Sequence, residues 1–338
     1  MGGAFVGLAD DGSAIYWNPA GLGFQGSSLS LSYTGISPMA TYKYDAAMVD
    51  AKSVSQLHSA PNFFGNYNMG AWSFGLGVFV PAGLGVEWDG EELSNLTGGQ
   101  ALDWKSRIGV IDIAPAVAYK INDTCALGVT FKIYYAFFDL ERPQMGQYVE
   151  ESSGTGFGFT VGGLYKFNEM VQLGLTFRSE TKVTMDGDAS DTQIPIDSKF
   201  EREVTWPMWI AGGLAVHASK ALTLTLDGQY SNWSVLDQLT AEYTDWGQEG
   251  HFLLNWDDAT QIRFGANYDL SPAAAVRVGY YYDPAPAPDE TLNILFPSST
   301  NHVATAGFSY YAEKWTIDLG LEYLFGAERD VAPAPANE

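Results

Sequence analysis

The sequence has few basic residues. Its 338 residues contain 17 Lys and Arg against 40 Asp and Glu, so the formal net charge is −23. Proteins that bind phosphate backbones need clustered Lys and Arg, and this chain has no such run, so no nucleic-acid partner is expected. Cysteine is also scarce. Cys125, the only one, can form neither an intramolecular disulfide nor a thiolate metal cage, and we interpret it as a small apolar residue.

Long hydrophobic runs are missing as well. No stretch reaches the roughly 18 to 20 consecutive apolar residues of a membrane-spanning helix, which excludes the helical class of membrane protein. Residues 1–11 lack the basic and apolar regions of a secretory signal, so either the protein is cytoplasmic or the chain begins after its signal. The content of 46% hydrophobic and 14% aromatic residues argues against a disordered chain.

Patterns that would indicate catalysis or metal binding are absent too. The four histidines have neither metal-ligand spacing nor a nearby Ser or Cys nucleophile motif; they are His58, His217, His251 and His302. The acidic stretch 87–92 lacks the ligand spacing of a calcium loop. The sequence therefore predicts no enzyme, no cofactor and no metal site.

What the sequence does contain is alternation of apolar and polar residues. Leu222, Leu224 and Leu226 share one face of an extended segment, while Thr223 and Thr225 share the other. Segments of this kind number about thirteen and lie near 27–35, 60–69, 71–80, 107–120, 124–140, 154–167, 170–183, 200–217, 221–233, 258–269, 273–283, 301–311 and 314–325.

The connections between these segments alternate in length. Tight turns such as 122–123 and 313–314 are followed by longer polar connections such as 36–59 and 234–257. Short turns at one end and long loops at the other are typical of an outer-membrane β-barrel, whereas a soluble β-sandwich has shorter strands and no such rule. The sequence therefore predicts an all-β protein, a transmembrane antiparallel β-barrel in the outer membrane of a Gram-negative bacterium.

The predicted number of strands is odd, although a closed single-chain bacterial barrel has an even number. The barrel is expected to span residues 26–325. The remaining 326–338 would form a tail or the start of a last external loop, and they are too rich in proline to supply a strand. We therefore expect one strand to be missing from the chain.

Residues 1–25 are not predicted to form a strand. Their Gly, Asp, Ser and Pro content favours a compact loop, which contains Asp10-Asp11 and the triplet Asn18-Pro19-Ala20. With these motifs the chain resembles the FadL family of outer-membrane transporters for long-chain fatty acids and aromatic hydrocarbons. Further blocks similar to that family follow in the same order at 177–183, 207–209, 227–234, 277–280 and 283–288.

The resemblance implies a fourteen-stranded barrel plugged by the N-terminal segment as a hatch. A hydrophobic small molecule would enter from outside, bind in an apolar pocket, and leave sideways through the wall near the third strand after hatch movement. Gly75, Gly77 and Pro81 are the candidates for this lateral opening, because Gly and Pro weaken strand pairing. Close packing or a bend of the barrel is the alternative explanation for the two glycines.

The resemblance also points to a ligand head-group contact. Arg142 falls at the family's basic position after the fifth strand, whereas Asp257 falls where fatty-acid members have a lysine. Because an anion disfavours a carboxylate, neutral hydrocarbons are as plausible as fatty acids. The candidate pocket aromatics are Phe137, Phe138, Phe157, Phe159, Trp206, Trp209 and Trp256, each of which could instead pack in the wall or face lipid.

Charged residues facing the lumen are expected to pair with one another. We expect Arg178, Arg263 and Arg277 to form ion pairs with carboxylates such as those of Asp227, Asp318 and Glu322.

The expected binding partners of the protein are the hydrophobic ligand, outer-membrane lipid and lipopolysaccharide. We expect a monomer. Two alternatives stay open: a surface-exposed binding or adhesion barrel without transport, and a lipid-modifying barrel enzyme, for which the sequence offers no Ser, His and carboxylate cluster.

Overall fold

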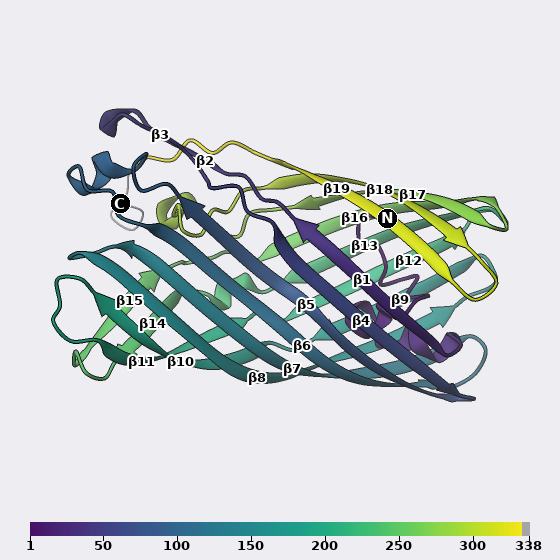
Figure 1. The fold of residues 1–338 in the computed structure, drawn as a ribbon. Coiled ribbons are helices and arrows are strands. Elements are labelled where there is room, and N and C mark those ends of the chain that lie inside the picture. The colour runs from purple at the N-terminus through teal and green to yellow at the C-terminus, as the bar shows by residue number, and fades with distance from the viewer. Residues whose placement is uncertain (333–338) are drawn as a thin grey trace.

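The computed structural model describes residues 1–332 and shows an antiparallel β-barrel, as the sequence predicts (Figure 1). Residues 333–338 of the expected tail lie outside the described residues. Nine strands of the wall are continuous: β1 (Ser28–Ile36), β4 (His58–Met69), β5 (Trp72–Trp88), β6 (Trp104–Lys120), β7 (Cys125–Pro143), β8 (Gln147–Lys166), β17 (Ala274–Asp283), β18 (Asn301–Tyr311) and β19 (Thr316–Gly326).

Four further strand positions are interrupted part-way along the wall. Each consists of two segments, one nearer each end of the barrel: β9 (Val171–Arg178) with β10 (Thr181–Asp191), β12 (Trp209–His217) with β11 (Ser198–Trp206), β13 (Leu222–Ser231) with β14 (Gln238–Tyr243), and β16 (Ala259–Ser271) with β15 (Gln248–Leu253). Both β9 and β10 pair with β8, for example, so they occupy the same place in the wall. Thirteen strand positions result, in agreement with the sequence prediction.

The strands at the two edges of this sheet leave a seam. Among the described residues, β1 pairs only with β4, and β19 pairs only with β18. Both edge strands begin at the end of the barrel that carries the short turns, so they run parallel to each other, and both are exposed along their whole length. One strand of opposite direction would fit between them with the antiparallel geometry of the rest of the wall.

The long-loop end differs from the prediction, because wall strands extend into residues expected to form connections; β14 and β15, for example, lie within 234–257. We expected a connection over 141–153, but β7 and β8 continue into it and leave a turn of only 144–146. The alternation there is hidden in the sequence, because Tyr148, Glu150 and Ser152 face a polar lumen and resemble loop residues. β7 and β8 therefore project beyond the length that a barrel strand of about ten residues needs to cross a membrane.

Short elements complete the fold. The hairpin of β2 (Thr41–Tyr44) and β3 (Val49–Lys52) packs on Trp88 and Leu93 at the long-loop end. The helices are α1 (Ala14–Trp17), η1 (Pro19–Phe24), η2 (Asp45–Ala47), η3 (Ser94–Thr97), η4 (Trp233–Val235) and η5 (Asp289–Thr291). None of the helices in the described residues is long and apolar enough to cross a membrane.

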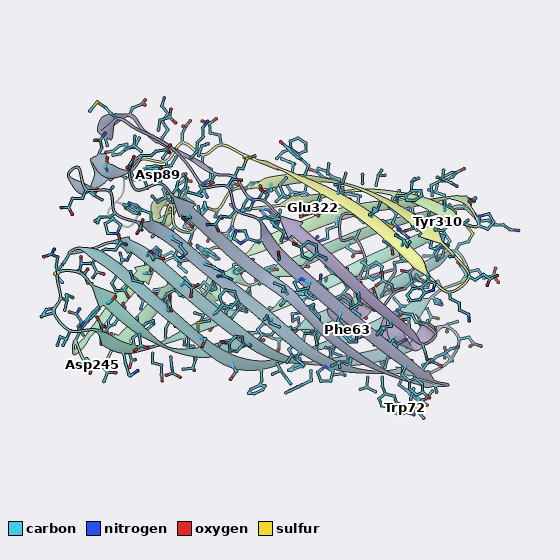
Figure 2. All side chains as sticks on the ribbon, viewed as in Figure 1. Phe63, Trp72, Asp89, Asp245, Tyr310 and Glu322 are labelled. Carbon is cyan, nitrogen blue, oxygen red and sulfur yellow. The ribbon has the colours of Figure 1, made fainter. Side chains whose placement is uncertain are left out.

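Side chains on the outer face of the wall are apolar. Trp72 and Tyr310 mark the end with short turns, whereas Asp89 and Asp245 mark the end with long loops (Figure 2). Along β7, outward and buried positions alternate, so that Phe131 and Tyr135 are exposed while Lys132 and Tyr134 are buried inside. An apolar outer surface around a polar interior is what a strand-built membrane protein requires.

Candidate functional site

Residues 1–25, which we call the N-terminal segment, fold inside the barrel. The segment contains α1 and η1, and η1 contacts β5, β6, β7 and β8. Asn18 is fully buried and organises it: its Nδ2 donates to the carbonyl oxygens of Val6 at 2.9 Å and Gly163 at 3.1 Å. Its Oδ1 accepts from the Ala20 amide at 3.3 Å and caps η1, in which Pro19 is the first residue. The Asn-Pro-Ala triplet thus joins the segment to the wall.

Glycines in the wall make room for the N-terminal segment. A Cβ atom added to any of several luminal glycines would lie under 3.0 Å from the segment; these are Gly75, Gly128, Gly162, Gly174, Gly213 and Gly279. At Gly75 the obstacle is Ile15 Cδ1, at 2.9 Å, and at Gly77 Ile15 Cγ2 lies at 3.2 Å. The structure therefore supports the close-packing explanation for Gly75 and Gly77 that the sequence left open.

Polar side chains of the wall hold the backbone of the segment. Asp227 Oδ2 accepts from the Val6 amide at 2.7 Å, and Arg178 Nη2 donates to the Tyr16 carbonyl at 2.7 Å. Arg263 Nη1 donates to the Gly2 carbonyl at 3.3 Å. In residues 1–332 neither Arg178 nor Arg263 forms the expected ion pair with a carboxylate, because both bind backbone carbonyls of the segment; Arg263 nevertheless lies opposite Asp227 in the pairing of β13 with β16.

Arg277 behaves as the sequence predicts. Its Nη1 lies 3.2 Å from Asp318 Oδ1 and also donates to the Ser309 hydroxyl. The pair joins β17 to β19 across β18, next to the seam. A luminal ion pair of this kind balances the charge of a guanidinium inside the barrel.

Asp10 and Asp11 have different surroundings. Asp11 Oδ1 accepts from the Ser13 amide at 2.7 Å and from the Ser13 hydroxyl at 2.6 Å, which fixes the turn before α1. The Asp10 side chain is accessible to solvent but lies within the barrel, where the surrounding protein atoms displace much of its water. This desolvation raises the pKa of Asp10 to about 6, and the nearby charge of Asp11 adds to the shift.

The pairing of β4 with β5 stops part-way along the wall. The last paired residues are Phe63 and Val78, and the register of β5 with β6 shifts between Phe79 and Ala82, a stretch that includes Pro81. Beyond this level, within the part of the chain that the structure describes, the end of β4 pairs only with β1. The Phe79 ring turns inward and lies 5.5 Å from the Tyr16 ring of the N-terminal segment.

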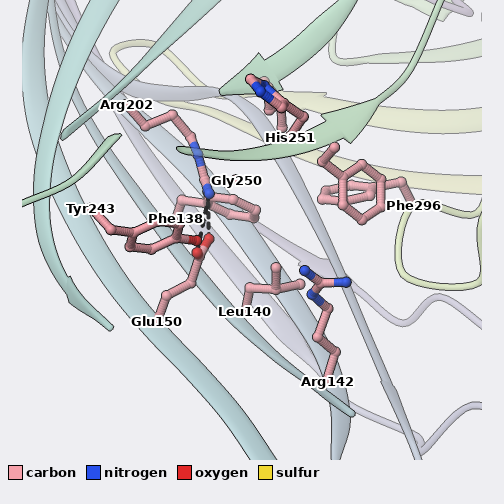
Figure 3. A pocket seen from close by; sticks show the side chains of 11 residues that line it. Phe138, Leu140, Arg142, Glu150, Arg202, Tyr243, Gly250, His251 and Phe296 are labelled. Carbon is pink, nitrogen blue, oxygen red and sulfur yellow. Dashed lines mark hydrogen bonds and ion pairs between the residues drawn. The ribbon is translucent and has the colours of Figure 1, made fainter. Parts of the chain in front are cut away.

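A cavity lies inside the long-loop end of the barrel (Figure 3). Its walls come from β7, β8, β11, β14 and β15 and from the loop 284–300. The lining residues are Phe138, Leu140, Arg142, Glu150, Arg202, Leu239, Tyr243, Gly250, His251, Phe252 and Phe296. Its free volume is about 20 Å³, room for about one water molecule, so the pocket is closed in this structure.

The loop 284–300 closes the pocket. Leu295 and Phe296 are buried, and the Phe296 ring lies 5.9 Å from Phe138 and 5.0 Å from Phe252. The Ser106 hydroxyl donates to the Leu295 carbonyl, and Trp88 Nε1 donates to the Ile294 carbonyl at 2.9 Å. The loop therefore fills much of the lumen at this end of the barrel.

An ion pair is buried in the wall of this pocket. Both terminal guanidinium nitrogens of Arg202 donate to the Glu150 carboxylate: Nη1 contacts Oε1, and Nη2 lies 3.1 Å from Oε2. The Tyr148 hydroxyl also donates to Glu150 and lies 2.6 Å from the Tyr243 hydroxyl. Glu150 is 1% exposed and Arg202 5%, so the pair is screened from water.

Arg142 also lines the pocket, nearer its rim. Its guanidinium lies over the Tyr148 ring at 5.4 Å, and its Nε is buried without a hydrogen-bond partner. Within residues 1–332 it forms no ion pair. Asp257 is exposed and does not line the pocket; its amide donates to the Pro286 carbonyl at 2.8 Å.

The comparison with known protein families agrees with this architecture. Residues 1–336 match the family described as "Outer membrane protein transport protein (OMPP1/FadL/TodX)". The chain belongs to this family. The resemblance seen in the sequence is thereby confirmed, and so are the barrel fold and the outer membrane as its location.

Relatives of this OMPP1/FadL/TodX chain are distant in sequence. The long-chain fatty acid transport protein of Escherichia coli is 25% identical over 313 residues, which cover 75% of this chain and 66% of that protein. Outer membrane protein P1 of Haemophilus influenzae is 22% identical, with 75% and 63% covered. The chain thus spans just under two thirds of the length of these two relatives.

Solved structures of the family share the fold. A FadL homologue of Pseudomonas aeruginosa superimposes with a TM-score of 0.82 at 18% identity, covering 98% of this chain and 90% of that one. The toluene transporter TbuX of Ralstonia pickettii gives a TM-score of 0.71 at 18% identity, covering 96% and 95%.

The predicted pocket aromatics divide into two groups. Phe138 lines the pocket, Trp206 and Trp256 pack against the same apolar cluster, and Trp209 contacts the N-terminal segment through Val6. The structure corrects the other three: Phe137, Phe157 and Phe159 occupy outward positions of β7 and β8, because residues on the two faces of a strand alternate.

Sequence reasoning missed Glu150, Arg202 and Phe296. One signal was available for Arg202, which shares the inward face of its strand with Phe200 and Val204 and is therefore a charge on an apolar face. Phe296 lies in an irregular loop, where no periodicity indicates direction. The partnership of Glu150 with Arg202 depends on the placement of β8 and β11 on either side of β10, which the sequence does not reveal.

Proposed function

We propose that this protein is a passive channel that carries hydrophobic small molecules across the outer membrane. The observation that supports this most is the pocket behind the loop 284–300, which is lined in part by the apolar side chains Phe138, Leu239 and Phe296 and accompanies an N-terminal segment seated inside the barrel. Burial of apolar ligand surface, at about 25 cal/mol per Å², would supply the affinity. Two relatives are named for such cargo: a long-chain fatty acid transport protein and a toluene transporter.

In this proposal residues 1–25 are the hatch and residues 26–325 the barrel. Asn18, Pro19 and Ala20 anchor the hatch, and Asp10 and Asp11 belong to the part that changes position. Ligand would leave where the pairing of β4 with β5 stops, beside Pro81 and the inward ring of Phe79. Gly75 and Gly77 contribute by seating Ile15 next to this exit.

Transport of this kind requires no catalytic group, and we propose that the protein is not an enzyme. It would function as a monomer surrounded by outer-membrane lipid and lipopolysaccharide. Arg142 would contact the polar end of a ligand at the pocket rim, because its guanidinium has no anionic partner in residues 1–332 and its Nε lacks an acceptor.

The test is to identify what co-purifies with the full-length gene product. Protein purified from outer membranes is extracted with organic solvent, and the extract is analysed by mass spectrometry for the wild type and for Arg142→Ala. We expect hydrophobic molecules in the wild type, and loss from the variant of those that carry a polar end group. An extract without any protein-dependent hydrophobic compound would contradict the proposal and would favour the surface-binding alternative.

A further inference from the structure

We propose that Glu150 serves as a built-in carboxylate that makes this pocket prefer neutral hydrophobic ligands over fatty acids. This inference rests on the proposed transport function and specifies its substrate class. Glu150 lines the pocket together with Phe138 and Leu140, and it already binds Arg202 with both oxygens (Figure 3).

The groups around Glu150 are those that recognise a carboxylate. A guanidinium that forms two parallel hydrogen bonds gives the strongest geometry for a carboxylate, and a hydroxyl adds a third donor. In this pocket Arg202 provides the first and Tyr148 the second. Because Glu150 already binds the Arg202 guanidinium and the Tyr148 hydroxyl, the most buried cation of the pocket is not available to a ligand carboxylate.

The energetics favour the internal carboxylate over an incoming one. Separating the buried pair of Glu150 and Arg202 would leave two charges uncompensated among apolar side chains. A ligand carboxylate beside the intact pair would lie close to the negative charge of Glu150 in a medium of low dielectric constant. A neutral chain or ring meets neither cost, since Phe138, Leu239 and Phe296 provide apolar surface.

Arg142 does not replace Arg202 in this role. It is only half-buried at the rim, and its charge faces the ring of Tyr148. A cation at such a position is partly hydrated, so it gives a carboxylate less than a dry guanidinium would. It can accept a weakly polar group without selecting for a full negative charge.

The experiment compares two ligands with the same chain, laurate and its neutral methyl ester. Binding to the purified full-length protein is measured by quenching of tryptophan fluorescence, since Trp206 and Trp256 pack on the pocket cluster. The wild type should bind methyl laurate at least tenfold more tightly than laurate. Glu150→Gln should strengthen laurate binding about tenfold and change methyl laurate binding by less than twofold.

Two further variants serve as controls. Glu151→Gln changes the neighbouring residue, which is exposed on the outer face, and should leave both affinities unchanged. The double variant Glu150→Gln, Arg202→Gln removes the whole pair and should lose the gain in laurate binding while still binding methyl laurate. If Glu150→Gln alone fails to fold, the comparison of laurate with methyl laurate in the wild type still tests the idea.

The outcomes separate the inference from the function on which it rests. Laurate that binds the wild type as tightly as methyl laurate overturns the role of Glu150 but leaves transport standing. A gain in laurate binding that persists in the double variant, which lacks Arg202, also overturns the role of Glu150 and leaves transport standing. If neither ligand binds the wild type or any folded variant, both the pocket function and this inference are wrong.

Discussion

Single glycines decide how the N-terminal segment lies in the barrel. A Cβ atom on Gly174 would collide with the Val6 carbonyl, whereas a Cβ atom on Gly228 would meet nothing within 4 Å. Gly174 faces the segment, whereas Gly228 is exposed on the outer face of the nearby strand β13. The contact is therefore specific to the positions that the segment covers.

These two positions give a matched pair of variants. Gly174→Ala should displace the segment and lower the free energy of unfolding by about 1–3 kcal/mol, the usual cost of overpacking. Gly228→Ala should leave it unchanged within about 0.5 kcal/mol. Thermal unfolding in detergent, together with leakage of a small sugar through reconstituted protein, measures both effects. Equal behaviour of the two variants would refute the seating of the segment.

Asp10 gives the segment a pH dependence. Its folded-state pKa of about 6 exceeds the ordinary value near 4, so folding favours its neutral form. Stability is therefore lost as pH rises from about 4 through 6 and stays lower at pH 7. The charges that influence Asp10 are those of Asp11, which adds to the shift, and Arg277, which opposes it.

The variant Asp10→Asn tests this sign. Its Tm should change less between pH 5 and pH 7 than that of the wild type, and it should be the more stable protein at pH 7. Asp123→Asn, at an exposed turn, serves as the control with unchanged pH dependence. A wild-type Tm that rises over the same interval, with Asp10→Asn abolishing the rise, would reverse the assignment.

At the residue scale, the sequence predicted the anchoring motif better than the pocket. Asn18, Pro19 and Ala20 form a contiguous motif that is visible in the sequence, although the Gly163 carbonyl that Asn18 binds lies 145 residues away. The contacts of Glu150 with Arg202 join positions 52 residues apart, so no local pattern reveals them. The sequence prediction placed Phe137 and Phe138 together in the pocket, although neighbouring residues of a strand face opposite sides and only Phe138 faces inward.

Among the elements, the loop 284–300 has the clearest mechanical role. Arg329, which follows β19, holds it closed: Nη1 donates to the carbonyls of Ala287 at 2.9 Å and Ser298 at 3.0 Å, and Nη2 pairs with Asp289. The loop carries Phe296 into the pocket. In the proposed function, movement of this loop would give access to the pocket from outside.

Removing the ring at position 296 should open the pocket. Phe296→Ala is expected to speed binding of methyl laurate several-fold, measured by stopped-flow quenching of tryptophan fluorescence, because the ring no longer fills the ligand space. Ile196→Ala, at an exposed loop position of the same end, is the control. A binding rate unaffected by Phe296→Ala would show that ligand enters elsewhere.

For the whole molecule, the sequence predicted architecture but not the details of the wall. Strand number and the lengths of the short turns follow from alternation, which a barrel imposes on every strand. The interruptions at 179–180 and 207–208, and the extension of β8 to Gln147, did not follow, because polar luminal residues resemble loops. The seam between β1 and β19 agrees with the odd number of strands found in the sequence.

The most direct test of the central claim is uptake by intact cells. The full-length gene product is expressed in a Gram-negative host that lacks its own transporter of this family, and entry of radiolabelled methyl laurate and laurate is followed over time. Entry should be faster with the protein than without it, and the increase should be larger for the methyl ester than for laurate. Entry of both compounds at the rate of cells without the protein would contradict the central claim.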